Sequence, residues 1–269
     1  MIPFNFEYYK PDSLKEAVTI FSDAQRTGLK PFYYGGGTEI ITMSRLNSIS
    51  PDVVIDIKGI PECSVFCMDN DRLVIGSGIT LSTIKESNLF PLLGEACGRI
   101  ADHTVQDKIT IGGNICGTII YRESLLPLFL SNAEVSIAGS NVFYSSQVVD
   151  AFNNGKCLKV GELLVSISID KEFLNHKYWH IKKVSAEKIG YPLVSVSALS
   201  HQGLIKMAFS GVCRFPFIVN DLNTFNISKE AIANQYIQEF PSSILNDIEG
   251  SSAYREFVLR DSILNILNS

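Results

Sequence analysis

Residues 110–117 read Thr-Ile-Gly-Gly-Asn-Ile-Cys-Gly, and residues 33–40 read Tyr-Tyr-Gly-Gly-Gly-Thr-Glu-Ile. Each glycine-rich segment follows an apolar stretch and ends in small or hydrogen-bonding residues. A backbone without side chains approaches a phosphate closely, and successive N–H groups in such a turn form a concave anion site. Two segments of this kind suit a ligand with two phosphates, which indicates a dinucleotide.

The residues around the first segment predict a small β-α-β unit. Residues 31–34 are typical of a short strand, a helix is expected to begin near Thr38 or Glu39, and residues 53–57 are typical of a second strand. The first segment is not a G-x-G-x-x-G fingerprint. No convincing acidic residue ends a second strand about 20 residues further on, so the sequence disfavours a standard Rossmann site.

Hydrogen-bonding side chains within both segments strengthen the phosphate interpretation. The hydroxyls of Thr38 and Thr110 can donate to phosphate oxygens, and Asn114 can hold a ribose hydroxyl or a loop carbonyl. A helix that begins after Gly37 would add the positive end of its dipole. A run of glycines alone is usually a plain turn, so the pairing of the segments carries this argument.

Composition excludes several other classes. The chain has 269 residues, 46% hydrophobic and 19% charged, which is typical of a soluble globular protein, and its net charge of -5 disfavours general nucleic-acid binding. We expect a cytoplasmic protein without a membrane span. The six cysteines are scattered, and His176 and His180 lack a third ligand, so neither a metal site nor disulfides are expected.

Further patterns along the chain predict an α+β protein with a boundary near residue 170. A hairpin is expected from residues 193–199 and 204–209, and a long helix from about Ser251 to Leu267. Further expected strands are 73–78, 135–138 and 163–169. Further helices are expected at 92–100, at 125–130 and after residues 11–13, where Leu14, Ala17, Val18 and Phe21 recur at helical spacing.

In this order, the two segments resemble the FAD-binding subunit or domain of the molybdenum hydroxylases, the family of xanthine dehydrogenase and carbon monoxide dehydrogenase. Residues 35–40 are similar to its first loop, Ala/Val-Gly-Gly/Asn-Thr-Asp/Glu-Leu/Ile, with glycine at the opening position. Residues 110–115 match its second loop, Ser/Thr-Ile/Val-Gly-Gly-Asn-Ile/Leu, throughout. Residues 161–167, Gly-Glu-Leu-Leu-Val-Ser-Ile, are similar to its Gly-Glu-Ile/Leu-Leu/Ile strand.

The resemblance spans nearly the whole chain and implies a fold. That fold is a p-cresol methylhydroxylase-type FAD-binding domain over residues 1–170, with α/β subdomains of about 1–57 and 58–170. A small α+β C-terminal domain over residues 171–269 would follow it.

The resemblance also implies the residues of a non-covalent FAD site. Backbone amides from Gly35 to Glu39 would hold the pyrophosphate, Ile100 and Ala101 would lie along the flavin or its ribityl chain, and Leu164 would face the adenine end. The full cofactor-binding set is Tyr33, Tyr34, Gly35, Gly36, Gly37, Thr38, Glu39, Ile40, Ile100, Ala101, Thr110, Gly113, Asn114, Gly117, Glu123, Leu164 and Tyr191.

Two stretches depart from the family pattern. The family commonly follows its second loop with Ala-x-Pro-x-Ser/Ala-Asp, whose Asp contacts the nucleotide, and here the proline is missing and Glu123 takes the acidic place. The family's Ser-Arg-Arg-x-x-Asp becomes Ser-Ala-Glu-Lys-Ile-Gly at residues 185–190, which leaves Tyr191 as the expected contact to the flavin ring from that side.

The function implied is that of an electron-transfer subunit whose chemistry occurs on the flavin, with no catalytic side chain. Electrons would pass from 2Fe-2S clusters on a small partner subunit through FAD to NAD+ or another acceptor. Molybdopterin would be bound by a large partner subunit. Two alternatives stay open: a stand-alone flavin reductase, such as an enolpyruvyl sugar-nucleotide reductase, and a flavin-free assembly or scaffold protein.

Overall fold

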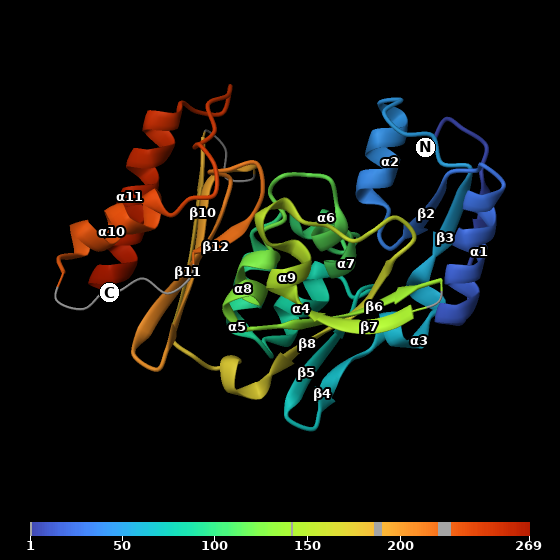
Figure 1. The fold of residues 1–269 in the computed structure, drawn as a ribbon, viewed down its shortest axis with the longest axis horizontal. Helices are drawn as coiled ribbons and strands as arrows, with labels where there is room; N and C mark the ends of the chain where they lie inside the picture. The colour runs from blue at the N-terminus through green and yellow to red at the C-terminus, as the bar shows by residue number, and fades with distance from the viewer. Residues whose placement is uncertain (1, 141, 186–189, 220–226) are drawn as a thin grey trace.

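The computed structural model describes residues 2–140, 142–185, 190–219 and 227–269. Its strands form three sheets that follow one another along the chain, with helices between and around them (Figure 1). The mixture of helices and sheets confirms the α+β class expected from the sequence. Within the described ranges, no helix is both long and apolar enough to cross a membrane, and the cytoplasmic location stays a prediction.

The N-terminal sheet contains the predicted β-α-β unit, formed by β2, α2 and β3, and a third strand, β1, that was not predicted. Its strand order is β1-β3-β2, and both strand pairs are parallel. The carboxyl ends of parallel strands meet at one edge, so the glycine segment after β2 lies beside the residues that follow β3. The elements are β1 (Glu7–Tyr9), α1 (Leu14–Arg26), β2 (Pro31–Tyr34), α2 (Thr38–Arg45), β3 (Val53–Asp56), the 3-10 turn η1 (Ile57–Gly59) and α3 (Pro61–Ser64).

The middle sheet is antiparallel and has the order β4-β5-β8-β6-β7. Its apolar side chains and those of the helices packed on it form a large buried cluster, which contains Ile75, Leu92, Ile111, Phe129 and Ile167. The elements are β4 (Phe66–Asp69), β5 (Arg72–Gly76), α4 (Leu81–Ser87), α5 (Pro91–Gly98), α6 (His103–Gln106), α7 (Ile111–Cys116), α8 (Leu125–Leu130), β6 (Glu134–Gly139), β7 (Val142–Gln147), α9 (Val148–Phe152), η2 (Asn153–Gly155) and β8 (Leu163–Asp170).

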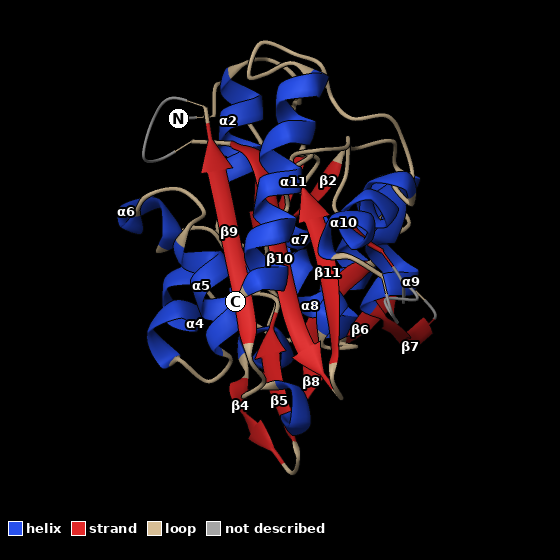
Figure 2. Ribbon diagram, turned by 90° about the vertical axis from the view of Figure 1, so that its left-hand side faces the viewer, coloured by secondary structure: helices blue, strands red, loops and turns tan. Residues whose placement is uncertain are grey.

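The C-terminal sheet is antiparallel, with the order β12-β11-β10-β9. Helices α10 and α11 cover one of its faces, while α8 packs against the other (Figures 1 and 2). Strand β10 is therefore buried on both faces over most of its length. The elements are η3 (Lys171–Phe173), β9 (Tyr178–Val184), β10 (Pro192–His201), β11 (Leu204–Ser210), β12 (Phe217–Val219), α10 (Lys229–Gln238) and α11 (Ser252–Asn268).

The cores of the last two sheets are continuous. Leu199 of β10 and Ala208 of β11 belong to the same buried cluster as the helices of the middle unit. A separate cluster of apolar side chains fills the space between the C-terminal sheet and its two helices. The C-terminal sheet is thus fixed against α8, beside the segment that contains the second group of glycines.

Three features of the fold can be compared with the sequence prediction; the first differs from it and the other two agree with it. The second glycine segment was expected to be a loop, but residues Ile111–Cys116 form the short helix α7. Pro127 lies in the first turn of α8, where the missing N–H and the fixed backbone angle of proline are tolerated. The expected hairpin forms between β10 and β11, with Gln202 and Gly203 at positive φ in its turn.

Candidate nucleotide-binding site

The first glycine segment connects β2 to α2 at the carboxyl edge of the parallel sheet. Gly37 is in the left-handed region with φ 71°, and a Cβ there would lie 2.1 Å from the ring of Tyr34. Only glycine satisfies both the backbone angle and the ring contact. This edge of a parallel sheet is where nucleotide ligands commonly bind.

Helix α2 begins without a side-chain cap. Its N-cap residue is Gly37, and its first backbone hydrogen bond runs from the Ile41 N–H to the Gly37 carbonyl at 2.8 Å. Among the described residues, the N–H groups of Thr38, Glu39 and Ile40 have no acceptor. Three consecutive free donors at the positive end of a helix form a site for an anion.

The N–H groups of the second glycine segment differ from the expectation, because protein atoms already accept them. Ile111 N–H donates to the Ile79 carbonyl at 2.8 Å, and Gly112 N–H donates to the Ser77 carbonyl at 2.9 Å. Thr110 is the N-cap of α7 and accepts the next two donors, Gly113 N–H on its hydroxyl oxygen and Asn114 N–H on its carbonyl. The bare amides predicted here are therefore not available to a phosphate.

The glycines instead let the two segments touch. A Cβ on Gly36 would lie 1.5 Å from the Lys108 carbonyl oxygen, and a Cβ on Gly35 would lie 2.5 Å from Oγ1 of Thr110. Gly112 packs closely on Ser77, because a Cβ on Gly112 would lie 2.6 Å from the Cβ of Ser77. The structure thus brings together the segments that the sequence pairs, and close packing is the reason for most of their glycines.

A carboxylate joins the two segments a second time. Oε1 of Glu39 accepts the Thr118 N–H at 2.8 Å and the Thr118 hydroxyl at 2.5 Å. A Cβ on Gly117 would lie 2.5 Å from Oε2 of Glu39. Gly117 is therefore needed for the approach of this side chain, which the sequence does not indicate.

Other predicted residues lie around this junction in different settings. Oδ1 of Asn114 accepts the Ser124 hydroxyl at 2.5 Å, which uses one end of its amide within the protein. The hydroxyl of Tyr33 donates to the Gly161 carbonyl at 3.1 Å. The side chain of Leu164 lies in the middle core, 3% exposed, so it is not open to an adenine ring.

Ile100 and Ala101 form the turn between α5 and α6. Ala101 has φ 55°, a left-handed conformation that costs a non-glycine residue some strain and is found more often at functional positions. The buried side chain of Gln106 holds this turn by donating to the Ala101 carbonyl at 3.1 Å.

Glu123 is bound to the C-terminal sheet. Its carboxylate accepts the Lys182 ammonium at 2.9 Å and the Ser195 hydroxyl at 2.6 Å. The Lys182 and Glu123 side chains are only 7% and 4% exposed. Burial raises the pKa of Glu123, while the neighbouring charge of Lys182 opposes that shift. Glu123 therefore links the segment after α7 to β9 and β10, and a nucleotide contact by Glu123 stays a prediction.

Tyr191 lies immediately before β10 and stacks on Tyr121, with ring centroids 4.6 Å apart. Residues 186–189, which fall in the stretch compared with the family's Ser-Arg-Arg motif, lie outside the described residues. Arg122, next to Tyr121, is buried, and its Nε has no hydrogen-bond partner in the described part of the chain. A contact between Tyr191 and a flavin stays a prediction.

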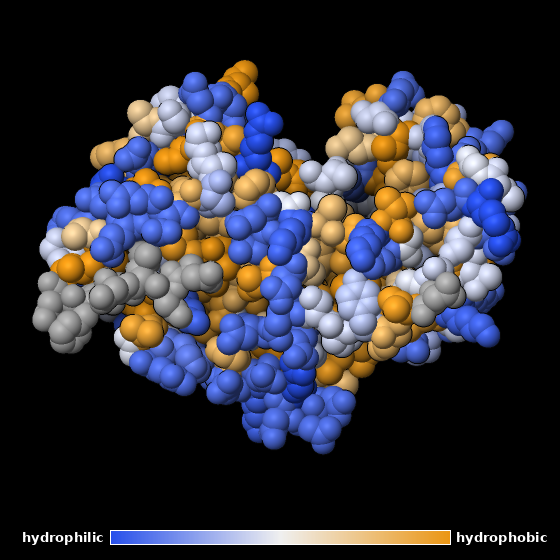
Figure 3. Space-filling view, in the orientation of Figure 1, coloured by the Kyte–Doolittle hydropathy of each residue, from blue (hydrophilic) through white to orange (hydrophobic). Residues whose placement is uncertain are grey.

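A notch opens between the two lobes of the molecule in the space-filling view (Figure 3). In the same orientation, α2 lies on one side of this notch, α6 and α7 lie below it, and the C-terminal sheet lies opposite (Figure 1). The uncapped start of α2 and the turn at Ala101 belong to the segments around it. Binding of an elongated ligand in this notch stays a prediction.

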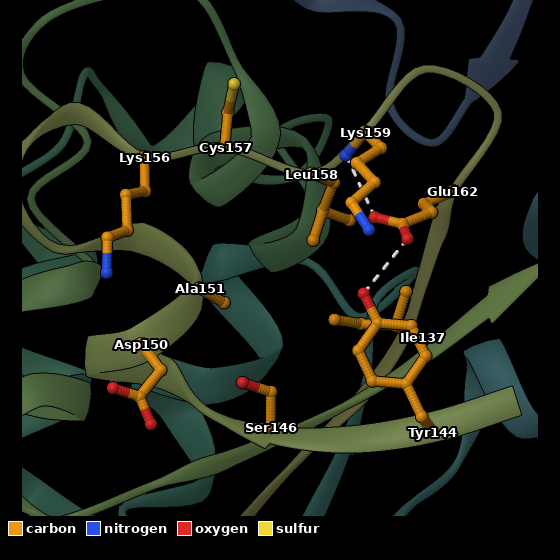
Figure 4. A pocket seen from close by; sticks show the side chains of 10 residues that line it. All are labelled: Ile137, Tyr144, Ser146, Asp150, Ala151, Lys156, Cys157, Leu158, Lys159 and Glu162. Atoms are coloured by element: carbon orange, nitrogen blue, oxygen red, sulfur yellow. Dashed lines mark hydrogen bonds between the residues drawn. The ribbon is translucent and has the colours of Figure 1, made fainter.

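A separate cavity of about 290 Å³ lies beside β7 and α9 (Figure 4). Glu162 accepts the Tyr144 hydroxyl at 3.0 Å and the Lys159 N–H at 2.9 Å on its rim. None of the sequence-predicted site residues is among its lining residues. We assign no ligand to it.

His176 and His180, which are four residues apart in the sequence, contact different residues in the structure. His180 lies in β9 and contacts Ser197, whereas His176 contacts His201 at 3.1 Å. In the ranges that the structure describes, no group of three or more His, Cys, Asp or Glu side chains is arranged to hold a metal ion. The cysteines of those ranges are all free thiols.

Sequence reasoning missed one charged cluster at the edge of the parallel sheet. Asp56 ends β3 about 20 residues after the first glycine segment, at the distance where a ribose-binding acid is sought. Its two oxygens are taken by the Tyr8 hydroxyl at 2.6 Å and by the Lys58 ammonium at 2.7 Å. The sequence shows that an acidic residue ends this strand, but it does not show that Tyr8 and Lys58 bind that residue.

Comparisons with known proteins show what the chain is similar to. Residues 4–171 match the family described as the FAD binding domain in molybdopterin dehydrogenase. The chain is 26% identical to the glyceraldehyde dehydrogenase medium chain of Sulfolobus acidocaldarius, over 97% of this chain and 96% of that relative. It is 36% identical to the carbon monoxide dehydrogenase medium chain of Hydrogenophaga pseudoflava, over 43% of this chain and 40% of that relative.

A solved structure shares the fold of the whole chain. It is the carbon monoxide dehydrogenase of Hydrogenophaga pseudoflava that lacks the Mo-pyranopterin moiety of its molybdenum cofactor. One of its chains matches with a TM-score of 0.87 and 22% identity, covering 100% of this chain and 98% of that chain. At this identity the likeness concerns the fold alone, and it confirms the fold class that the family resemblance implies.

Proposed function

The chain belongs to the family of FAD-binding domains in molybdopterin dehydrogenases, and we propose that it is the flavin subunit of a multi-subunit enzyme of this family. It is an oxidoreductase subunit, and its cofactor is FAD. The relatives reported above are named as medium chains of dehydrogenases, which supports an assembly with other chains.

The observation that carries the proposal is the uncapped start of α2. The free N–H groups of Thr38, Glu39 and Ile40 fit the negative charge of a pyrophosphate. The second glycine segment supports this site from below by packing and does not donate its own amides. The residues present therefore fit FAD, with the first segment as its phosphate site.

Bound FAD supplies the redox chemistry, since it accepts electrons and passes them on. The residues of this chain bind the cofactor and fix its orientation. Thr110 and Asn114 hold α7 in place through hydrogen bonds, and Glu39 fixes α2 to Thr118. The buried Lys182–Glu123 pair holds the C-terminal sheet beside the same segments.

The finer parts of the proposal concern the partners and the direction of electron flow. We assign molybdopterin to a large partner subunit and 2Fe-2S clusters to a small one, with electrons passing from the clusters through FAD to NAD+ or another acceptor. We also propose the division into residues 1–57, 58–170 and 171–269. It is supported by the end of β8 at Asp170 and the start of the next sheet at Tyr178.

Affinity purification of the tagged chain from its own cells, followed by an absorbance spectrum, tests the proposal. We expect flavin bands, release of FAD on heat denaturation, and co-purification of a molybdopterin-containing chain and an iron–sulfur chain. A colourless protein that rejects added FAD would instead support a scaffold. A yellow chain without partners that oxidises a reduced pyridine nucleotide in the presence of an enolpyruvyl sugar nucleotide would support the stand-alone reductase.

The acceptor is identified by a second experiment on the purified complex. Its flavin is reduced anaerobically with limiting dithionite, NAD+ is added, and the flavin band is followed. Recovery of the oxidised band identifies NAD+ as an acceptor. If the oxidised band recovers only with a quinone or a redox dye, NAD+ is not an acceptor. That result leaves the flavin-subunit assignment intact.

A further inference from the structure

A lysine lies directly beneath the first glycine segment. The ammonium of Lys58 donates to the Gly35 carbonyl oxygen at 2.7 Å and to Oδ1 of Asp56 at 2.7 Å. It also lies 4.7 Å from the ring centroid of Tyr34, a distance at which a cation and an aromatic face attract each other. The Lys58 side chain is therefore held by three neighbours from two strand ends.

The partner of this lysine is itself fixed. Asp56 is 5% exposed, and its carboxylate accepts the Tyr8 hydroxyl at 2.6 Å and the Lys58 N–H at 3.0 Å. Burial alone would raise the pKa of Asp56, but the hydrogen bonds from Lys58 and Tyr8 hold it below its usual value. The carboxylate is thus charged at neutral pH and holds the ammonium in one place.

The ring of Tyr34 contacts both the Lys58 ammonium and the glycine turn. One edge of its ring lies against Gly37, where a Cβ would be 2.1 Å away, and the Lys58 ammonium lies over its face. The lysine thus contacts the turn at its first residue through a hydrogen bond and at its last residue through the ring.

The bond to Gly35 decides the direction of the next amide. A peptide unit is planar, and its C=O and N–H point in opposite directions. When Lys58 fixes the Gly35 carbonyl on its own side, the N–H of Gly36 points away from the lysine. That N–H has no acceptor among the described residues, and it precedes the free donors of Thr38, Glu39 and Ile40.

We propose that Lys58 is a positioning residue for the pyrophosphate of FAD, which it serves by orienting the Gly35–Gly36 peptide so that the Gly36 N–H joins the donors of α2. This inference rests on the proposed function, because it takes FAD as the ligand of that site. Asp56 and Tyr8 form the support of Lys58 and act on the cofactor only through it. Of the three ammonium donors of the lysine, one reaches the Gly35 carbonyl and one reaches the Asp56 carboxylate.

The test compares four variants of the full chain, each stripped of flavin and titrated with FAD. Lys58→Met removes the ammonium and keeps most of the length, Lys58→Arg restores donors, and Tyr8→Phe removes only the support of Asp56. Lys30→Met is the matched control, because Lys30 is exposed before the amino end of β2, opposite the glycine edge. The melting temperature of each apo chain is measured beside its FAD dissociation constant.

We expect Lys58→Met to weaken FAD binding by about tenfold to a hundredfold, the effect of losing one hydrogen bond to a charged group. Lys58→Arg should recover most of that loss, Tyr8→Phe should show a smaller loss, and Lys30→Met should match the wild type. The phosphorus NMR signals of bound FAD should move toward those of free FAD in Lys58→Met and stay in place in Lys30→Met.

Three results would overturn the inference in distinguishable ways. A wild-type chain that binds no FAD removes the proposed function together with the role of Lys58. Wild-type and Lys58→Met chains with equal FAD affinity and equal phosphorus spectra remove only the role of Lys58. If Lys58→Met and Lys58→Arg lose affinity in proportion to a lower apo melting temperature, with unchanged phosphorus signals, Lys58 is a stabilising residue and not a positioning residue.

Discussion

The carboxylate of Glu39 accepts both the N–H and the hydroxyl of Thr118, a residue 79 positions further along the chain. Glu39 lies in the first turn of α2, and Thr118 lies just past the end of α7. The contact therefore fastens the helix that supplies the free donors to the helix that supports it.

Replacing Glu39 by alanine should loosen this junction. Glu39→Ala removes the acceptor of both Thr118 donors, and we expect a loss of about 1–2 kcal/mol in the free energy of unfolding, together with weaker FAD binding. Glu39→Gln is the matched control, because an amide oxygen accepts the same two bonds and carries no charge. It should retain stability and bind FAD at least as tightly. Urea unfolding of the apo chain and FAD titration measure both effects, and an unchanged Glu39→Ala chain would contradict this role.

Two neighbouring glycines should respond differently to the same substitution. In Gly112→Ala the new Cβ would meet Ser77 at 2.6 Å and its carbonyl oxygen at 2.8 Å, so we expect a loss of about 1–3 kcal/mol or more. In Gly113→Ala the Cβ meets only Oγ1 of Thr110 at 3.0 Å, and the helix propensity of alanine stabilises α7 by up to about 1 kcal/mol.

FAD affinity then tells whether Gly113 faces the cofactor. Gly113 is exposed in the absence of a ligand. A methyl group there should reduce FAD affinity without lowering the melting temperature of the apo chain. Unchanged affinity in a well-folded Gly113→Ala chain would remove Gly113 from the site.

The Lys182–Glu123 pair gives a prediction for the contact between the C-terminal sheet and the segment between α7 and α8. Lys182→Met leaves the Glu123 carboxylate buried without its charged partner, and such a loss costs about 3–5 kcal/mol. The double variant Lys182→Met/Glu123→Gln removes the buried charge as well, and we expect it to recover most of the stability. Chemical unfolding of the three chains measures the interaction, and equal losses in the single and double variants would contradict it.

Much of the fold follows from local sequence signals. The glycine turn between β2 and α2, the hairpin of β10 and β11, and the last helix each rest on a periodic pattern next to a turn or cap residue. The helix α7 does not, because Gly112 and Gly113 lower helix propensity and the helix depends on hydrogen bonds to Ser77 and Ile79. Only the packing of distant segments supplies those acceptors.

The candidate site, like the fold, was predicted only in part. The sequence pairs the two glycine segments and predicts the free donors at Thr38, but it also assigns amides of the second segment that the protein uses itself. The hydrogen bonds that join Lys58 and Tyr8 to Asp56 depend on the parallel register of β1 and β3, which sets Tyr8 beside Val54. The partner of a side chain on a neighbouring strand is set by the tertiary structure, and residue types alone do not determine it.

His180 gives a prediction for pH. Burial lowers the pKa of His180 from 6.5 to about 3, and the nearby charges of Arg99 and Lys182 act in the same direction. The folded chain therefore keeps this ring neutral while the unfolded chain protonates it near pH 6.5. Stability is unaffected above pH 6.5, falls as the pH drops from 6.5 toward 3, and changes no further from this cause below that value.

The size of the effect follows from the proton bound only by the unfolded chain. Between about pH 7 and about pH 5 the wild type should lose about 2 kcal/mol on this account. His180→Gln, which keeps a polar group beside Ser197, should lack that part of the decline although its stability at neutral pH is lower. Urea unfolding of both chains at the two pH values measures the difference, since every other titrating group is shared. Parallel declines in the two chains would show that His180 is protonated in the folded state and that its surroundings accept the charge.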